Sequence, residues 1–313
     1  MENHGGASIS DGYGDSVSRI DLYDRASQLR AQRVPFVMAT VVRADAPTSA
    51  KPGDSAVVLA DGTIEGFVGG SCAQATVRAE SLRSLANGNS TMLIIAAGDD
   101  SPVGGDSPGV VRVSNPCISG GTLEMFLEPA LPVPLLAIYG QSPIATALAA
   151  GASALGFEAR LAGAEDAIHG DLKAVVVATH GFDEEEIITK ALSAGVDYIG
   201  LIASRKRGDA ILGAMDLAPE ARSRVHTPAG LDIGARNPAE IAISILAEIV
   251  SLSPKSPKAE PRLVAIDPVC EMQVAMVESS LHSEIDGTTY WFCAKGCQRA
   301  FSADPQAFLV PKS

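Results

Sequence analysis

The feature that most constrains the fold is an alternation of short apolar runs with helix-like segments between residues 135 and 250. The clearest runs are LLAIYG, AVVVATH and YIGLIAS. Strands that are apolar throughout are buried on both faces, and the helices between them supply the crossovers that parallel strands need. We therefore predict a Rossmann-like, doubly wound parallel sheet over residues 131–251. Its last helix is expected to begin at Asn237 and Pro238, with Glu240 completing a capping box.

The preceding segment, residues 15–130, mixes helix and strand patterns without that regular alternation. Residues 98 to 117 are rich in Gly, Asp and Pro and are predicted to form a loop. The segment as a whole is predicted to be a separate N-terminal α/β domain. Its helices are predicted over 20–33 and 73–85, its strands over 35–42, 91–97 and 122–127, and a hairpin over 56–68.

A Pro- and Lys-rich stretch, residues 252–263, is predicted to be an extended linker. The residues after it, 264–313, form a module so small that it needs a metal or a partner for stability. Three of the five cysteines of the chain, Cys270, Cys293 and Cys297, lie in this module. Their thiolates suit zinc or copper(I), so we predict a metal site there.

Charge and composition exclude several classes of protein. The formal net charge is −13 and the few basic residues are dispersed, which argues against a nucleic-acid partner. No apolar run approaches the roughly 18–20 residues that span a bilayer. The first 20 residues are polar and lack the apolar core of a signal peptide. We expect a cytoplasmic protein with no membrane span, whose thiols stay reduced.

The first turn of the predicted parallel sheet departs from a dinucleotide fingerprint. Gly140 is present, but Ser142 stands where a second glycine would let the backbone approach a pyrophosphate, and Pro143 removes an N–H. Ordinary NAD binding is therefore disfavoured. Two later places at strand ends suit a different phosphate-bearing ligand: His180, and Ser204 with Arg205 at the start of a predicted helix. A tight turn, a core histidine and a solvated helix start are the structural alternatives for these residues.

Several blocks of sequence resemble the xanthine dehydrogenase accessory-factor family (XdhC/CoxI-like), and the turn at Ser142 looks more like its carbon monoxide dehydrogenase-associated branch. The resemblance implies a factor that binds molybdenum cofactor (molybdopterin), protects it during sulfur loading and delivers it to an apo-hydroxylase. It also directs attention to Asp232, which lies in the most specific block. The blocks are 38–49, 65–72, 117–128, 200–207 and 226–248.

The family assignment suggests a role for two cysteines outside the terminal module, because soft sulfur suits a molybdenum–dithiolene centre. Cys72 follows two glycines at a predicted helix start, where the helix dipole favours a thiolate. Cys117 precedes another glycine-containing loop. Small buried hydrophobic side chains are the structural alternative for both. The cofactor-binding candidates of this domain are Gly69, Gly70, Cys72, Cys117, Gly120 and Gly121.

The terminal module resembles the YHS domain, a TRASH-like treble-clef metal module, in the stretches DPVCEM, YWFCAKGC and FSADP. The fourth metal ligand is predicted to be His282, with Asp267 or water as alternatives. If the client is of the carbon monoxide dehydrogenase type, whose site pairs molybdenum with copper, the module could carry copper. A structural zinc is the competing hypothesis.

We therefore predict an accessory factor without catalytic residues of its own. Its implied partners are the apo form of a molybdenum hydroxylase and a cysteine desulfurase, and a homodimer is compatible with dimeric clients. Two functions from other classes stay open. One is an NAD(P)-dependent oxidoreductase on a Rossmann scaffold, and the other is a thiolate metal sensor built on the terminal module.

Overall fold

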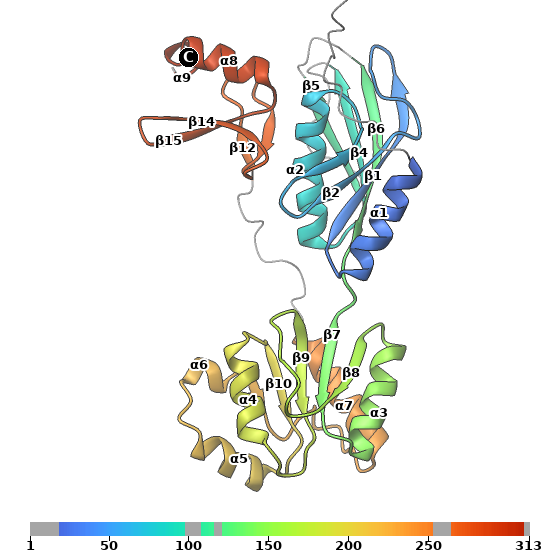
Figure 1. Cartoon of the computed structure of the whole chain (residues 1–313), viewed down its shortest axis with the longest axis vertical. Coiled ribbons are helices and arrows are strands. Elements are labelled where there is room, and N and C mark those ends of the chain that lie inside the picture. Colours follow the sequence, from blue (N-terminus) through green and yellow to red (C-terminus); the bar gives the residue numbers. More distant parts are fainter. Residues whose placement is uncertain (1–18, 98–107, 116–120, 253–263, 310–313) are drawn as a thin grey trace, which may run out of the picture. The chain divides into compact units, whose positions relative to one another are not determined.

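The computed structural model describes residues 19–97, 108–115, 121–252 and 264–309. The chain divides into two compact units, one of residues 1–132 with 256–313 and the other of residues 133–255 (Figure 1). The N-terminal domain and the C-terminal module therefore belong to the same unit. Within the described ranges, every helix is too short or too polar to cross a membrane.

The N-terminal domain is built on a mixed sheet with the strand order β3-β2-β1-β6-β4-β5. Neighbouring strands run antiparallel except β4 and β5, which are parallel. The predicted hairpin is confirmed, because Ala56 pairs with Gly66. The elements are α1 (Arg19–Ala31), β1 (Phe36–Asp45), β2 (Ser55–Leu59), β3 (Ile64–Gly66), α2 (Ser71–Asn87), β4 (Thr91–Ala97), β5 (Val110–Asn115) and β6 (Thr122–Ala130).

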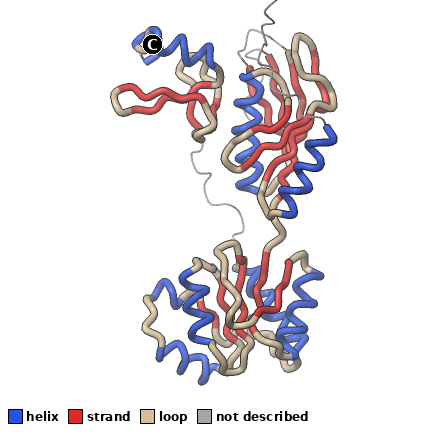
Figure 2. Tube along the Cα trace, in the orientation of Figure 1, coloured by secondary structure: helices blue, strands red, loops and turns tan. Residues whose placement is uncertain are grey.

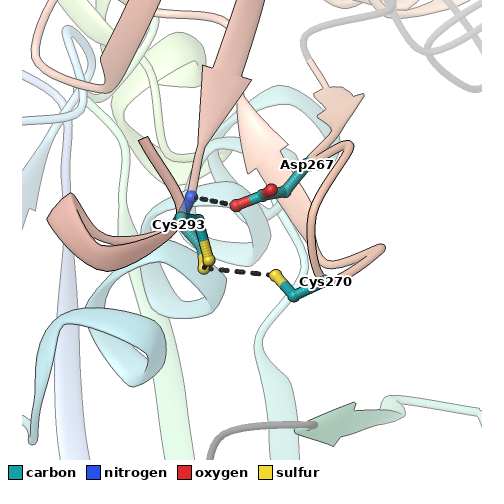
Figure 3. Close-up of side chains that lie close together, drawn as sticks. Asp267, Cys270 and Cys293 are labelled. Carbon is teal, nitrogen blue, oxygen red and sulfur yellow. Dashed lines mark hydrogen bonds between the residues drawn. The ribbon is translucent and has the colours of Figure 1, made fainter. Parts of the chain in front are cut away.

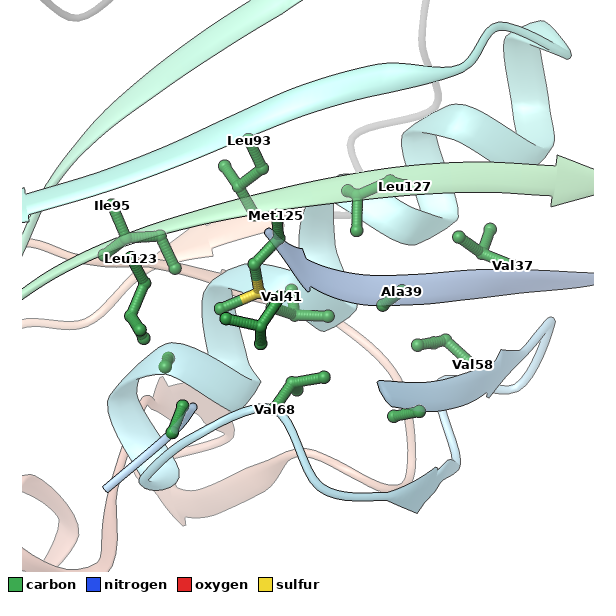
Figure 4. Close-up of a cluster of buried hydrophobic side chains, with 14 residues drawn as sticks. Val37, Ala39, Val41, Val58, Val68, Leu93, Ile95, Leu123, Met125 and Leu127 are labelled. Carbon is green, nitrogen blue, oxygen red and sulfur yellow. The ribbon is translucent and has the colours of Figure 1, made fainter. Parts of the chain in front are cut away.

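The two helices cover opposite faces of this sheet, because alternate residues of each strand belong to different cores. On β1, Phe36 packs with Leu22 and Leu29 of α1. The next residue, Val37, belongs to the larger core, which includes Val77 of α2 and is drawn in Figure 4. The sheet is thus covered by α2 on one face and, over β1 and β2, by α1 on the other.

The C-terminal module consists of two hairpins and two short helices. Its elements are β12 (Val264–Ile266), β13 (Gln273–Ala275), β14 (Leu281–Ile285), β15 (Thr288–Phe292), α8 (Lys295–Ala303) and α9 (Gln306–Leu309). Phe301 of α8 is fully buried and packs in a tilted arrangement on Tyr290 and Phe292, with ring centroids 4.8 and 5.3 Å apart. These rings hold α8 against the second hairpin.

The second unit is the predicted doubly wound sheet. All its strands are parallel, in the order β11-β10-β9-β7-β8. The strand order reverses between β7 and β9, which is where such folds open a crevice at the carboxyl ends of the strands. The elements are β7 (Leu135–Tyr139), α3 (Pro143–Ala154), β8 (Glu158–Ala162), β9 (Leu172–Val177), α4 (Glu184–Ser193), β10 (Tyr198–Leu201), α5 (Arg205–Ala214), α6 (Pro219–Arg222), β11 (Val225–His226) and α7 (Pro238–Ser251).

Helices cover both faces of the parallel sheet, as Figure 2 shows by colour. Leu148 of α3 and Ile245 of α7 pack on Ile138, whereas Ile187 of α4 and Leu212 of α5 pack on the other face of the sheet. The predicted start of α7 is confirmed in detail. Its Asn237 and Glu240 form a reciprocal capping box, and a proline occupies the first turn.

One element was missed from the sequence. The prediction of a loop over residues 98–117 is wrong for Val110–Asn115, which form β5 and pair in parallel with β4. The run is short and follows a Gly- and Pro-rich stretch, so its local pattern carries little strand signal. Its partner is a nonlocal strand, and that pairing stabilises it.

Candidate functional site

The first candidate site is a group of three thiols and one carboxylate in the C-terminal module. Asp267 and Cys270 lie in the turn between β12 and β13, Cys293 directly follows β15, and Cys297 lies in the first turn of α8. The donor atoms of these four residues all lie within 4.8 Å of one another. Two hairpins and a helix therefore converge to make the cluster.

The sulfur geometry suits a shared cation. Cys270 Sγ lies 3.4 Å from Cys293 Sγ, which lies 3.7 Å from Cys297 Sγ. A tetrahedral site with metal–sulfur bonds of about 2.3 Å separates its sulfurs by about 3.8 Å. Figure 3 shows the thiols of Cys270 and Cys293 pointing toward each other. The cluster and the type of its donors thus fit metal binding.

Asp267 holds the cluster together through the backbone. Its side chain is fully buried, and its two oxygens accept hydrogen bonds from the N–H groups of Val269 and Cys293, at 2.9 and 2.8 Å. The first bond shapes the turn that presents Cys270. The second, drawn in Figure 3, fixes the strand end that presents Cys293. Each carboxylate oxygen already has a partner, so Asp267 positions two thiols whether or not it also contacts a cation.

The thiols perturb one another strongly. The pKa of Cys270 is lowered, chiefly because the Cys293 thiol donates a hydrogen bond to its sulfur. The same hydrogen bond is the largest cause of a raised pKa at Cys293, and contact with Cys72 is the next. Burial raises the pKa of Cys297 to about 12. Crowded thiols resist ionising together, and a bound cation removes that penalty because it compensates the negative charges.

His282, the predicted fourth ligand, lies outside this group of donors. Its Nδ1 lies 2.9 Å from the carbonyl oxygen of Ser280, and its ring packs against Trp291 with centroids 4.8 Å apart. Of the two residues considered from the sequence for the fourth position, Asp267 is the one that the structure brings to the three cysteines.

The second candidate site is a cavity of about 480 Å³ in the other unit. It opens at the carboxyl ends of β10 and β11, and three residues singled out from the sequence, Ser204, Arg205 and Asp232, line it together. Ser204 is the N-cap of α5 and accepts a hydrogen bond from the Arg207 N–H. The cavity therefore lies beside the start of a helix, where the dipole and Arg205 both favour an anion. The remaining lining comes from residues 202–203, 228–231, 233–235, Ile241 and Ser244.

His180 lies elsewhere in this unit, after β9, in a loop with unusual backbone geometry. His180 and Asp183 both have positive φ, at 56° and 55°. The loop is tied down by Glu184, which is 5% exposed and accepts a hydrogen bond from Gly181 at 3.0 Å and an ion pair from Arg207 at 2.5 Å. Arg207 is thus engaged by a carboxylate. Of the three consecutive basic residues Arg205, Lys206 and Arg207, Arg205 is the one that lines the cavity.

The turn after β7 is closed by its own side chains. Ser142 is buried and accepts a hydrogen bond from Ala145 N–H at 3.2 Å, so it occupies the helix start that a dinucleotide pyrophosphate would use. A Cβ at Gly140 would lie 2.5 Å from the Ala178 carbonyl oxygen, which explains this glycine by packing. Both observations weigh against the nicotinamide-dependent alternative.

A buried polar network beside the cavity was not found from the sequence. The Glu248 carboxylate accepts hydrogen bonds from Tyr198 and from Gly230 N–H, at 2.6 and 2.8 Å, and His226 Nδ1 lies 3.3 Å away. His226 also stacks on Tyr198 with centroids 4.6 Å apart. These groups come from β10, β11 and α7, and they fix the segment that lines the cavity. The sequence signal that could have indicated this network is the presence of polar residues in otherwise apolar strands and helices.

The cofactor-binding residues predicted for the N-terminal domain lie in different surroundings. Cys117 and Gly120 lie outside the described residues. Gly121 is packed against backbone, since a Cβ there would lie 2.3 Å from the Pro47 carbonyl oxygen. Gly69 is buried, with φ at 123°, and Gly70 caps α2 with open space around it. Cys72 follows in the first turn of α2, where it packs among the cysteines of the C-terminal module.

Three family models match the chain. A model of the XdhC and CoxI family matches residues 29–95, a model of the XdhC Rossmann domain matches residues 136–249, and a model of the YHS domain matches residues 265–312. The first match lies in the N-terminal domain, the second covers the parallel sheet, and the third contains all members of the thiol cluster.

Two curated proteins are similar to the chain. Uncharacterized protein YqeB of Escherichia coli K12 is 28% identical over 269 residues, which cover 76% of this chain and 47% of that protein. A probable xanthine dehydrogenase subunit of Bacillus subtilis 168 is 40% identical over 78 residues, 25% of this chain and 22% of that protein. The chain thus spans less than half the length of these relatives. A solved structure of a xanthine dehydrogenase from Bacillus halodurans covers 75% of this chain and 97% of its own, with 19% identity and a TM-score of 0.37.

Proposed function

Because the chain belongs to the XdhC and CoxI family and ends in a YHS domain, we propose that it is a maturation factor for a molybdenum hydroxylase of the xanthine or carbon monoxide dehydrogenase type. In this role it binds molybdenum cofactor, assists its sulfuration and inserts it into the apo-enzyme. A cysteine desulfurase is the proposed source of sulfur. The similarity to a probable xanthine dehydrogenase subunit supports this class of client.

The observation that carries the proposal is the cavity at the carboxyl ends of β10 and β11. Its volume of about 480 Å³ accommodates a pterin-sized molecule, and its wall combines apolar residues with Ser204, Arg205 and Asp232. Molybdopterin is a pterin that ends in a phosphate. Arg205 and the start of α5 would hold that phosphate, while the Asp232 carboxylate would accept hydrogen bonds from the amino-pterin.

The residues present therefore fit the organic part of the cofactor. When bound, the cofactor supplies a molybdenum–dithiolene centre for the client enzyme. The chain's own residues bind and orient it. The Glu248 network holds Gly230 and the neighbouring cavity wall in place, and the Glu184–Arg207 pair fixes the start of α5. The proposed metal of the YHS domain is zinc or copper(I), held by Cys270, Cys293 and Cys297.

The proposal is tested by anaerobic binding of isolated molybdenum cofactor to the full chain, followed by ultrafiltration and molybdenum analysis. We expect near-stoichiometric retention. Arg205→Glu is expected to weaken it by about 10-fold or more, because hydrogen bonds to charged groups contribute about 1.5–3 kcal/mol.

Lys206→Glu is the matched control, since it makes the same charge change at the next position of α5 without lining the cavity. Retention comparable to wild type in the Lys206 variant, together with a loss in the Arg205 variant, supports a site in the cavity. No retention by the wild-type chain refutes direct cofactor binding. Equal retention by all three proteins refutes the cavity as its site.

A further inference from the structure

The helix α2 carries two apolar faces, and only one of them serves the core of its own domain. Val77 and Ala73 pack into the large core beneath the sheet. On another side of the helix, Ala75 packs with Met272 and Val274 of the C-terminal module. A helix buried on two sides is held between two partners. Here the two partners are the sheet of the N-terminal domain and the first hairpin of the module.

The contact between α2 and the module is close and specific. Ala79 and Leu82 of α2 form a second buried cluster with Ala275 of β13. Polar contacts flank it, because Arg83 donates a 2.6 Å hydrogen bond to Gln273 and Ser279 donates a 3.0 Å hydrogen bond to the Asp61 carbonyl oxygen. Small side chains along the helix let the hairpin approach closely. The module is therefore docked on α2 through buried contacts.

Cys72 extends this docking face to the metal cluster. Residues 72, 75, 79 and 82 follow the three- and four-residue spacing of a single helix face. Cys72 packs in the same cluster as Cys270, Cys293 and Cys297, and its thiol is near enough to that of Cys293 to contribute to the raised pKa of Cys293. Cys72 is not one of the four donors that all lie within 4.8 Å of one another. A thiol from a different domain thus adjoins a three-thiol site.

The three-thiol site has room in its coordination for this fourth thiol. Both oxygens of Asp267 already accept backbone hydrogen bonds, and His282 faces the Ser280 carbonyl oxygen and Trp291. Structural zinc sites are almost always four-coordinate, with thiolates as common ligands. Among the described residues, Cys72 is the remaining thiol beside the cluster.

We propose that Cys72 of α2 completes a four-thiolate site with Cys270, Cys293 and Cys297, which binds a thiophilic d¹⁰ cation, Zn²⁺ or Cu⁺, across the boundary between the two domains. This inference rests on the proposed metal binding by the module and adds the ligand that it lacks. A cation held in this way fastens the module to α2, so metal binding and docking of the module are coupled. Removal of the metal therefore loosens the contact around Ala75 and Met272.

The test uses the full chain, reduced and freed of metal under anaerobic conditions, with Co²⁺ as a spectroscopic probe. The intensity of sulfur-to-cobalt charge transfer scales with the number of thiolates, so Cys72→Ser is expected to lower it by about a quarter. Competition by Zn²⁺ and, separately, by Cu⁺ against a chromophoric chelator measures affinity for each cation. Loss of the fourth ligand is expected to weaken binding by about 10-fold or more, at least as much as loss of an outer-shell partner.

Two further variants separate loss of the Cys72 thiol from loss of docking. Ser71→Ala, at the exposed neighbouring position, is the matched control and is expected to bind like wild type. Ala79→Glu places a charge in the docking face but leaves every thiol intact, and it is expected to reproduce the loss of one thiolate from the cobalt spectrum. Such a result links the fourth ligand to docking.

The outcomes distinguish a failure of this inference from a failure of the proposed metal binding by the module. If wild type binds cobalt and zinc while Cys72→Ser gives the same spectrum and affinity, Cys72 is not a ligand and the inference is overturned, although the module still binds metal. If wild type binds neither cobalt, zinc nor copper, metal binding by the module fails as well.

Discussion

Tyr198 at the start of β10 donates a 2.6 Å hydrogen bond to the carboxylate of Glu248 on α7, and burial together with this bond raises the pKa of Tyr198 above its usual range. Because the same carboxylate also accepts from Gly230 N–H, the pair anchors the wall of the cavity. We expect Tyr198→Phe to lower the free energy of unfolding of this unit by about 1.5–3 kcal/mol, the usual contribution of a hydrogen bond to a charged group. Urea titration followed by circular dichroism measures it.

Tyr23→Phe is the matched control, since Tyr23 is 55% exposed on α1 of the other unit. It removes the same hydroxyl from a solvated position and is expected to change stability by less than about 0.5 kcal/mol. Equal stability of the two variants would show that the Tyr198–Glu248 bond contributes nothing net.

Most of the fold could be predicted from residue patterns. The parallel sheet follows from apolar runs such as LLAIYG, and the start of α7 follows from Asn237, Pro238 and Glu240. These features are local, so they are visible in a short window of sequence. The strand β5 was missed because its stability comes from pairing with β4. A short run in a Gly- and Pro-rich stretch does not reveal that partner.

The sequence indicated which residues could form the candidate sites, but it did not indicate fully which of them lie together in space. Three cysteines of the terminal module were found by their spacing, but the place of Cys72 beside them depends on docking between segments far apart in the chain. A signal for that docking was present, since Ala75, Ala79 and Leu82 give α2 a second apolar face. The apolar face alone does not show which element covers it, because its partner lies far away in the sequence.

Gly121 of the N-terminal domain was a cofactor-binding candidate, but its surroundings indicate that the glycine is needed for packing. A Cβ at Gly121 would lie 2.3 Å from the Pro47 carbonyl oxygen and 2.7 Å from that of Asp45. We expect Gly121→Ala to lower the free energy of unfolding by about 1–3 kcal/mol, because the backbone must shift to admit the methyl group. Urea titration of the full chain measures this change.

Gly70→Ala is the comparison, since the space around Gly70 is open and its φ is −68°. Its cost is expected to stay below about 1 kcal/mol, the difference between glycine and alanine at a helix start. If Gly70→Ala lowers molybdenum retention while the chain stays folded, the glycine acts through the ligand. A large loss of stability at Gly70 would contradict the open geometry.

The capping box of α7 predicts how the stability of the protein depends on pH. The N–H groups of Arg236 and Asn237 donate to Glu240, and these bonds hold its pKa below the ordinary value of 4.5. Because the folded-state pKa is the lower one, the stabilisation is complete above the unfolded-state pKa and is lost as the pH falls through the folded-state pKa. We expect the stability difference between wild type and Glu240→Gln to shrink as the pH falls below 4.5, since glutamine keeps the cap but does not titrate.

Urea titrations of both proteins between pH 6 and pH 3, roughly the range that brackets a carboxyl pKa, measure that difference. A difference that is constant over this range would show that the carboxylate at Glu240 has no electrostatic role at the helix start.

The hydrogen bonds of the buried Asp267 carboxylate predict a change in the stability of the terminal module, which tryptophan fluorescence can measure. Both its oxygens accept backbone N–H groups, from Val269 and Cys293. Asp267→Asn turns one acceptor into a donor that faces an N–H, and this leaves a buried polar group unpaired. We expect a loss of about 1–3 kcal/mol in the unfolding free energy of the module. Trp291 of β15 is the single tryptophan of the chain and packs in the cluster that joins the module to Ala75 of α2, so its fluorescence in urea reports unfolding of the module together with its release from α2.

Glu284→Gln, at an exposed position of β14, makes the same carboxylate-to-amide change and is expected to leave that transition unchanged. Because Asp267 acts on the thiols through the backbone, the Asp267 variant should still bind zinc, with an affinity reduced by about 10–100-fold, as when an outer-shell partner is removed. Complete loss of zinc binding while the Trp291 transition stays at its wild-type midpoint would instead make Asp267 a direct ligand. That result would displace Cys72 from the fourth position, so this variant and Cys72→Ser together decide which side chain completes the site.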